Sequence, residues 1–99
     1  MEIIKKQEGT ALVLSLAGRL DTTTAPMLES ALKESLEGIT DLRLDFAGLE
    51  YVSSAGLRVL LAAQKTMNAR QGRMELAGVN DSVKHVLDIT GFSPVLTFV

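Results

Sequence analysis

The chain has 99 residues, of which 46% are hydrophobic and 22% are charged, and its formal net charge at pH 7 is −2. This length corresponds to one domain over residues 1–99, and the apolar fraction is too high for an intrinsically disordered chain. Because the sequence contains no cysteine, it has neither a disulfide framework nor a thiolate zinc site. The scattered, slightly acidic charge argues against a nucleic-acid-binding surface and against a polybasic membrane anchor.

Residues 1–6 lack the basic start and the long apolar run of a secretory signal. No stretch of the sequence approaches 18 consecutive apolar residues, the length that a membrane-spanning helix needs. We therefore expect a cytoplasmic protein with no direct membrane insertion.

The first part of the chain predicts a hairpin followed by a helix. Residues 2–7 and 11–18 are both strand-like, and the glycine-containing connection between them suits a β-hairpin. Residues 11–18 are apolar on nearly both sides of the alternation, which is typical of a central strand. A helix is predicted to begin near Thr24, where polar cap residues precede Pro26, and to stop at Gly38.

The rest of the chain alternates strands with helices. The predicted elements are, in order, a strand over 41–46, a loop over 47–52, a helix from Ser53 or Ser54 to about Asn68, a strand over 73–77, a helix from Asn80 to Ile89 and a short strand over 95–99. Such an alternation implies right-handed crossovers between parallel strands. The sequence therefore predicts a single α/β domain with a mixed, mostly parallel sheet of four or five strands.

Several common catalytic and ligand-binding motifs are missing. The sequence has neither of the two common glycine-rich nucleotide loops, and its only histidine, His85, is interpreted as an exposed helix residue and not as a metal ligand. A hydrolase built on Ser54, His85 and Asp88 is an alternative, but the Gly-x-Ser-x-Gly nucleophile motif is absent. Asn80 lies in a formal glycosylation sequence and is interpreted as a helix N-cap. We predict no metal site and no cofactor.

The most informative stretch is the segment 45–61, in which a strand leads to Ser53 and Ser54 at the start of a helix. Free backbone N–H groups and the positive end of the helix dipole lie at such a start. One interpretation is that a serine caps the helix and that Gly56 permits close packing, with no further role. The other interpretation is that Ser54 accepts a phosphate, because a phosphoserine dianion is stabilised at that end of a helix.

Three segments have a recognisable pattern. Residues 16–21 (LAGRLD) with 24–26 (TAP) form a glycine-containing strand end and the start of a helix, and residues 51–57 (YVSSAGL) contain the two serines. Residues 72–79 with 86–92 form a late strand and a helix that ends in Thr-Gly. In this order, and over nearly the whole chain, the segments resemble the anti-sigma factor antagonists of the STAS (sulfate transporter and anti-sigma factor antagonist) domain type.

This resemblance implies a STAS domain over residues 1–99, with helices mainly on one face of the sheet. It assigns phosphorylation to Ser54, two places before the motif glycine. The sequence departs from the usual Asp-Ser-Ser/Thr-Gly-Leu motif by Ser53 in place of Asp and by Ala55 in place of Ser or Thr. The implied partner-binding residues are Asp21, Thr22, Ser53, Ser54, Gly56 and Arg58. For Asp21, a role as a turn or cap residue is an equal alternative.

The resemblance also implies a bacterial signalling phosphoprotein that regulates transcription through protein binding, and not an enzyme. The unphosphorylated domain would bind an anti-sigma factor that is also a serine kinase and so release the sigma factor. Phosphorylation of Ser54 would end this association, and a serine phosphatase would restore it. The alternative is a STAS docking subunit of a membrane lipid-transport complex or a stressosome-like assembly, in which phosphorylation has no role. Whether Ser54 accepts phosphate discriminates between the two.

Overall fold

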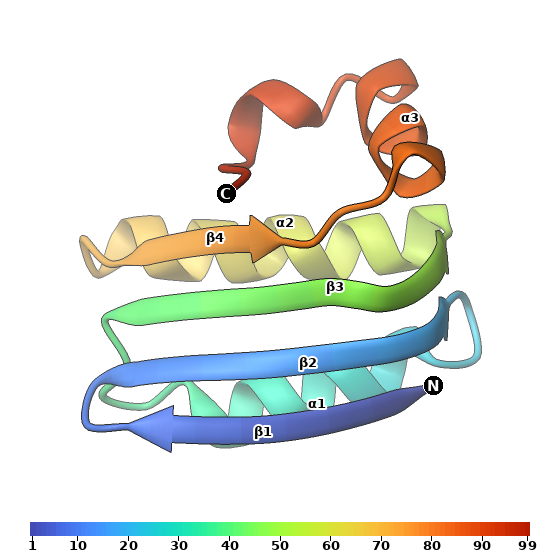
Figure 1. Ribbon diagram of the computed structural model, residues 1–99. Helices are drawn as coiled ribbons and strands as arrows, with labels where there is room; N and C mark the ends of the chain where they lie inside the picture. The colour runs from blue at the N-terminus through green and yellow to red at the C-terminus, as the bar shows by residue number, and fades with distance from the viewer.

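Four strands form one sheet in the order in which they occur in the sequence (Figure 1). In this computed structural model, which describes residues 1–99, the elements are β1 (Glu2–Glu8), β2 (Ala11–Leu20), α1 (Ala25–Ser35), β3 (Asp41–Val52), α2 (Ser54–Ala69), β4 (Arg73–Ala77), α3 (Asp81–Ile89) and a 3-10 turn, η1 (Ser93–Val95). The β1–β2 pair is antiparallel, whereas the β2–β3 and β3–β4 pairs are parallel. The predicted mixed, mostly parallel sheet is confirmed.

The period-two pattern of β2 and β3 divides the sheet into a covered and an open face. Leu14 and Leu44 pair across the two strands and are both 0% exposed. Both α1 and α2 pack on this face, whereas the opposite face, where Val13 pairs with the exposed Arg43, carries no helix (Figure 1). The prediction of helices mainly on one face is confirmed.

The helices contribute the apolar stripes that their sequence spacing predicts. Leu28 and Leu32 are buried from α1, and Leu57 and Leu60 are buried from α2. Burying a side chain of this kind contributes roughly 1.5–3 kcal/mol, so these stripes fix both helices on the sheet. The shorter α3 lies beyond the β4 edge of the sheet (Figure 1). None of the helices has the length and apolar composition that crossing a lipid bilayer requires.

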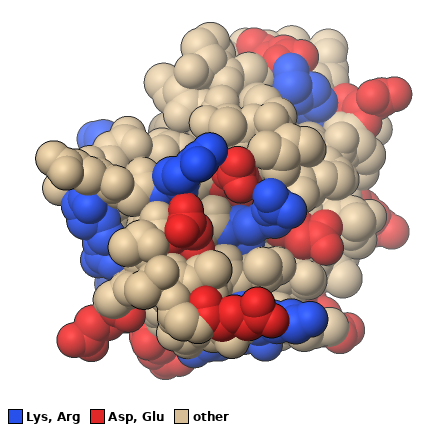
Figure 2. All heavy atoms as spheres, turned by 60° about the vertical axis from the view of Figure 1, so that its left-hand side comes forward, with Lys and Arg blue, Asp and Glu red and all other residues tan.

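The open face carries charges of both signs. Glu75 of β4 pairs with Arg43 of the neighbouring β3 at 3.1 Å and with Arg73 of its own strand at 3.8 Å. Acidic and basic side chains lie next to one another over the face shown in Figure 2. This side of the molecule therefore presents no large patch of a single charge.

The prediction of a loop over residues 47–52 is wrong, because β3 continues to Val52. The pairing register of β2 with β3 shifts between Ser15 and Ala17 and again at the end of β2, so the strand is irregular there. Gly48 lies against β2 so closely that an added Cβ atom would be 3.0 Å from the Cβ of Ala17. The irregular stretch interrupts the apolar alternation, which is why the sequence pattern did not show this part of the strand.

The predicted final strand over residues 95–99 is also wrong. Pro94 lies in the 3-10 turn η1, where its fixed φ angle is tolerated and its missing N–H is not needed. Beyond this turn, a single parallel bridge joins Phe98 to Leu76 of β4. The Leu76 N–H donates to the Thr97 carbonyl at 2.8 Å, and the Val99 N–H donates to the Leu76 carbonyl at 2.9 Å.

Candidate functional site

Parallel strands β2 and β3 end at the same edge of the sheet, where Leu20 pairs with Val52. The Ser53 N–H donates to the Leu20 carbonyl at 2.8 Å and so joins the end of β2 to the start of α2. The loop over residues 21–24 and the first turn of α2 therefore lie side by side. Loops that follow the strands of a rigid sheet are common locations for binding residues.

The two serines at the start of α2 have different environments. Ser53 is the half-buried N-cap, and its hydroxyl accepts a hydrogen bond from the Gly56 N–H at 3.4 Å. Ser54 is the first residue of the helix, is exposed, and makes no side-chain hydrogen bond within the protein. The predicted position of Ser54, at the exposed start of the helix that contains Leu57, is confirmed. Its phosphorylation remains a prediction.

Gly56 is buried and contributes close packing instead of an exposed surface. A Cβ atom at this position would lie 2.6 Å from Cγ of Leu20 and 3.1 Å from the Leu20 carbonyl oxygen. Because such contacts are too short for any side chain, α2 can approach β2 only with glycine here. The structure thus places Gly56 behind the surface on which the other predicted partner-binding residues lie.

Asp21 organises the turn that precedes α1. Its Oδ1 accepts hydrogen bonds from the Thr23 hydroxyl at 2.7 Å, the Thr23 N–H at 3.0 Å and the Thr24 N–H at 3.2 Å. The Thr24 hydroxyl in turn donates to the Arg19 carbonyl at 2.7 Å, which closes the turn onto the end of β2. The structure shows the turn role that was one of the two interpretations of Asp21.

The hydrogen bonds to Asp21 also set its charge. The hydrogen bond from the Thr23 hydroxyl lowers the pKa of the Asp21 carboxyl, partial desolvation opposes this effect, and the N–H groups of Thr24 and Thr23 lower the pKa further. Hydrogen bonds of this kind favour the charged form of the carboxyl group. Asp21 therefore presents a fixed negative charge beside Ser53 and Ser54.

Two residues of this region, Arg19 and Tyr51, were not among the site residues predicted from the sequence. Arg19 and Tyr51 pair across β2 and β3, and the Arg19 guanidinium lies over the Tyr51 ring at 4.3 Å from the ring centroid. The Arg19 Nε also lies 4.0 Å from Oδ2 of Asp21. Arginine and tyrosine are enriched at protein interfaces. Their pairing depends on the irregular register at the end of β3, which the sequence pattern did not reveal.

Thr22 and Arg58 are brought together between α1 and α2. Both line a hollow of about 420 Å³ that also contains Ala55 and Glu29. Both side chains belong to exposed residues, and Arg58 makes no ion pair or hydrogen bond within the protein. We call the following set the candidate surface: Arg19, Asp21, Thr22, Tyr51, Ser53, Ser54 and Arg58.

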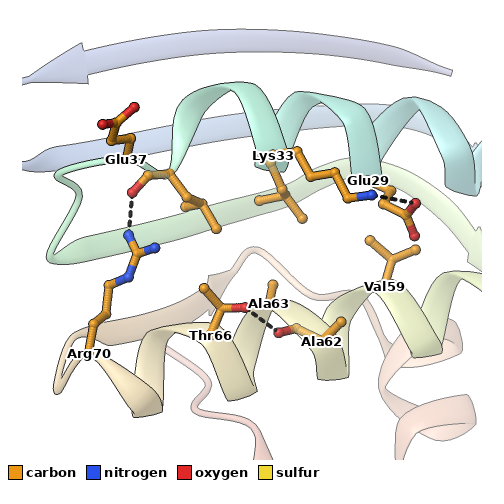
Figure 3. A pocket seen from close by; sticks show the side chains of 10 residues that line it. Glu29, Lys33, Glu37, Val59, Ala62, Ala63, Thr66 and Arg70 are labelled. Carbon is orange, nitrogen blue, oxygen red and sulfur yellow. Dashed lines mark hydrogen bonds and ion pairs between the residues drawn. The ribbon is translucent and has the colours of Figure 1, made fainter.

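A second groove, of about 360 Å³, lies between α1 and α2 and adjoins the hollow of Thr22 and Arg58, with which it shares Glu29, Val59 and Ala62 (Figure 3). Apolar side chains such as Leu32 and Val59 line it, and the Glu29–Lys33 ion pair, at 3.5 Å, lies at one side. At its other end the Arg70 guanidinium donates to the Leu36 carbonyl and so ties the end of α2 to the end of α1. None of the predicted site residues lines this groove.

The hydrolase alternative finds no support in the side-chain geometry. Asp88 accepts hydrogen bonds from Lys84 Nζ at 2.7 Å and from the Ser93 hydroxyl, and the Lys84 ammonium is the main cause that lowers the pKa of the Asp88 carboxyl. No hydrogen bond joins the exposed His85 to Asp88 or to Ser54. No group of three or more His, Cys, Asp or Glu side chains is arranged to hold a metal ion. The site presents an exposed hydroxyl with no general base bonded to it.

The sequence is similar to one family of known proteins. The STAS domain family matches residues 2–99. An anti-sigma-B factor antagonist from Listeria monocytogenes is 34% identical over 95 residues, which cover 94% of this chain and 82% of the relative. The anti-sigma-B factor antagonist of Bacillus subtilis is 28% identical over 91 residues, which cover 92% of this chain and 84% of the relative. These names indicate no enzyme activity.

Solved structures show the same fold at lower sequence identity. A candidate anti-sigma factor antagonist from Thermotoga maritima superimposes with a TM-score of 0.89 and 18% identity, covering 97% of this chain and 84% of that chain. The anti-sigma factor antagonist SpoIIAA in its unphosphorylated form gives a TM-score of 0.79 and 16% identity, covering 99% of this chain and 87% of that chain. Fold, family match and sequence relatives agree, and the chain therefore belongs to the STAS-domain family and, within it, to the anti-sigma factor antagonists.

Proposed function

We propose that this protein is a switchable antagonist whose candidate surface binds an anti-sigma factor with serine kinase activity and thereby releases the sigma factor. The observation that carries the proposal is the position of Ser54. It is exposed at the start of α2, beside the loop of Asp21 and Thr22, and it occupies the acceptor place in the motif of residues 51–57. The exposed groups around it are polar or charged, which suits a surface that binds and releases its partner.

The switch is a phosphoryl transfer to Ser54. The hydroxyl oxygen bonds to the γ-phosphorus of ATP held by the partner kinase, the hydroxyl loses its proton, and ADP leaves. A serine phosphatase restores the hydroxyl by hydrolysing the phosphate ester. Because the Ser54 hydroxyl makes no hydrogen bond within the protein, the transfer breaks no interaction of the fold.

The phosphate acts against partner binding more than against folding. A hydrated dianion in a contact that was formed by a neutral hydroxyl costs roughly 2 to 5 kcal/mol, or about 30-fold to several thousand-fold in affinity. In the free domain the phosphate stays in water beside the N–H groups of the first turn of α2, which favour it. The folded state is thus retained while the complex dissociates.

The test is a binding titration with the purified anti-sigma partner, measured by calorimetry. We expect tight binding by the parent protein and by Ser54→Ala, and weak binding by the phosphorylated form and by Ser54→Asp. Ser82→Asp is the matched control, since Ser82 is an exposed serine in the first turn of α3. Equal affinity of the parent, phosphorylated and Ser54→Asp proteins would contradict the switch.

Peptide mass spectrometry after incubation with the kinase and ATP locates the modification. One phosphate on Ser54 is the expected result. A phosphate on Ser53 would contradict the assignment of the acceptor residue. No phosphate at all would favour a STAS docking subunit that does not switch.

A further inference from the structure

Arg58 is an exposed cation that the unmodified protein leaves without a partner. Several other cations at the surface are paired, among them Lys33 with Glu29 at 3.5 Å and Arg43 with Glu75 at 3.1 Å. Arg58 forms no ion pair, although it lines the hollow that also contains Glu29. An arginine in this position is available to a new anion.

The spacing on α2 places Arg58 one helical turn after Ser54. Residues four apart lie on the same face of a helix with their Cβ atoms about 5–6 Å apart. Long side chains of a helix lean toward its N-terminus, so the Arg58 side chain can reach back over the turn that Ser54 begins. An acidic group followed by a basic group four residues later is the favourable orientation of such a pair.

The neighbouring carboxylates do not compete strongly for Arg58. Glu29 is paired with Lys33, and the Oδ1 of Asp21 is occupied by Thr23 and Thr24. The first turn of α2 contains no acidic residue. A phosphate on Ser54 would therefore be the first anion on the same helix face as Arg58.

We infer that the Arg58 guanidinium pairs with the phosphate of phosphorylated Ser54, as an intrahelical ion pair that forms only in the modified state. This inference rests on the proposed function, because it concerns the modified form of the same serine. The covalent bond to Ser54 fixes the position of the phosphate, and the planar guanidinium offers two parallel N–H donors to its oxygens. Phosphorylation then changes two groups of the candidate surface: Ser54 gains a charge, and Arg58 is withdrawn from contact with a partner.

The test uses protein in which phosphoserine is installed at position 54 during translation, so that no kinase is needed. Phosphorus NMR titrations at low salt measure the second pKa of the phosphate in the parent sequence, Arg58→Gln, Arg58→Lys and Lys65→Gln. We expect Arg58→Gln to raise this pKa by about 0.3 units, the size that an exposed pair at this spacing produces. Arg58→Lys should retain part of the effect.

Lys65→Gln is the matched control, because Lys65 is another exposed cation of α2 without an ion pair, two turns farther along the helix. We expect it to change the phosphate pKa clearly less than Arg58→Gln does, because Lys65 lies about three helical turns beyond Ser54 and the Coulomb interaction weakens with distance. Equal pKa values in the parent and Arg58→Gln proteins, or an equal shift in Lys65→Gln, would overturn the pairing.

Nitrogen-15 NMR adds a direct readout of the guanidinium. The Arg58 Nε–H signal should shift and become protected from exchange with water in the phosphorylated form, and not in Ser54→Ala. An Arg58 signal that is the same in all forms would also overturn the inference. If the kinase does not modify Ser54, the proposed function fails while these measurements still decide on Arg58, and the reverse also holds.

Discussion

The starts of α2 and α3 have the same backbone conformation at the N-cap, but different interactions hold them in place. Ser53 and Asn80 both have the extended backbone of an N-cap, and each follows a parallel strand. Asn80 uses its side chain twice: Oδ1 accepts from the Val83 N–H at 2.8 Å, and Nδ2 donates to the Leu49 carbonyl at 2.9 Å. The side chain of Ser53 makes one long contact, at 3.4 Å.

The start of α2 is held mainly by backbone contacts and not by the hydrogen bonds of a cap side chain. The Ser53 N–H bonds to the Leu20 carbonyl, and Gly56 packs directly on Leu20. A helix start that is held by its backbone therefore leaves its side chains available for other contacts, whereas a start that is held by its cap side chain does not. Three measurements test this difference, and a fourth extends the comparison to the start of α1.

The largest expected effect comes from Gly56→Val. The added side chain would lie within 2.6 Å of Leu20 and push α2 away from β2. Overpacking of this severity costs about 3 kcal/mol of the free energy of unfolding, as measured by urea denaturation. Ala62→Val, at an exposed position of the same helix, is the control and should change stability by less than about 0.5 kcal/mol. Equal stability of the two variants would contradict the close-packing role of Gly56.

Asn80→Ala should have the next largest effect. It removes the cap of α3, worth about 1 kcal/mol, and leaves the Leu49 carbonyl without its donor, worth about 1 kcal/mol more. The control is Ser82→Ala, because Ser82 lies in the same turn and makes no side-chain hydrogen bond. A loss no larger than that of the control would show that the two hydrogen bonds do not fasten α3.

Ser53→Ala should cost only about 0.5 kcal/mol, the low end of the range for a cap, because its hydrogen bond is long. Ser53→Asp should instead stabilise the protein by about 0.5 kcal/mol, since a carboxylate interacts favourably with the start of a helix. Both values come from thermal or urea denaturation at low salt. A loss in Ser53→Ala as large as that in Asn80→Ala would remove the contrast between the two helix starts.

The smallest effect concerns the start of α1 and depends on pH. Because its hydrogen bonds lower the pKa of Asp21 below the ordinary value of 3.8, the charged carboxyl contributes stability above pH 3.8, and this contribution is lost as the pH falls through the lowered pKa. Asp21→Asn keeps an oxygen acceptor and removes the charge. It should be less stable than the parent protein near neutral pH and equal to it in strong acid. A stability difference that does not change with pH would contradict the role of the charge.

The elements that the sequence predicted correctly depend on local patterns. The stripe of Leu57 and Leu60 and the two serines before it were sufficient to place the start of α2, and Asn80 was recognised as a cap from its residue type. The second hydrogen bond of Asn80, to Leu49, could not be predicted, because it joins residues 31 positions apart. For the same reason the Arg19–Tyr51 pair was missed, since it requires the register of two parallel strands.

The two wrong predictions have physical causes of the same kind. The pairing of residues 47–52 with β2 shifts register, so their side chains do not alternate as a regular strand requires. Residues 95–99 have strand-like composition, but the turn at Pro94 and the single bridge at Phe98 leave no room for a longer ladder. In the candidate site, the residue types and their motifs were sufficient to indicate Ser54 and Asp21. The burial of Gly56, which distinguishes it from the exposed residues of the site, is known only from the folded structure.

The strands lie in the sheet in the same order as in the sequence, and this order has a consequence for folding during synthesis on the ribosome. Each new strand pairs at the free edge left by the preceding one, so no strand has to be inserted between two others. A nascent chain that has released residues 1–69 already contains β1, β2 and β3 with both covering helices. Because domains fold from the N-terminus as they emerge, the sheet can grow in one direction during translation, with β4 and α3 added last.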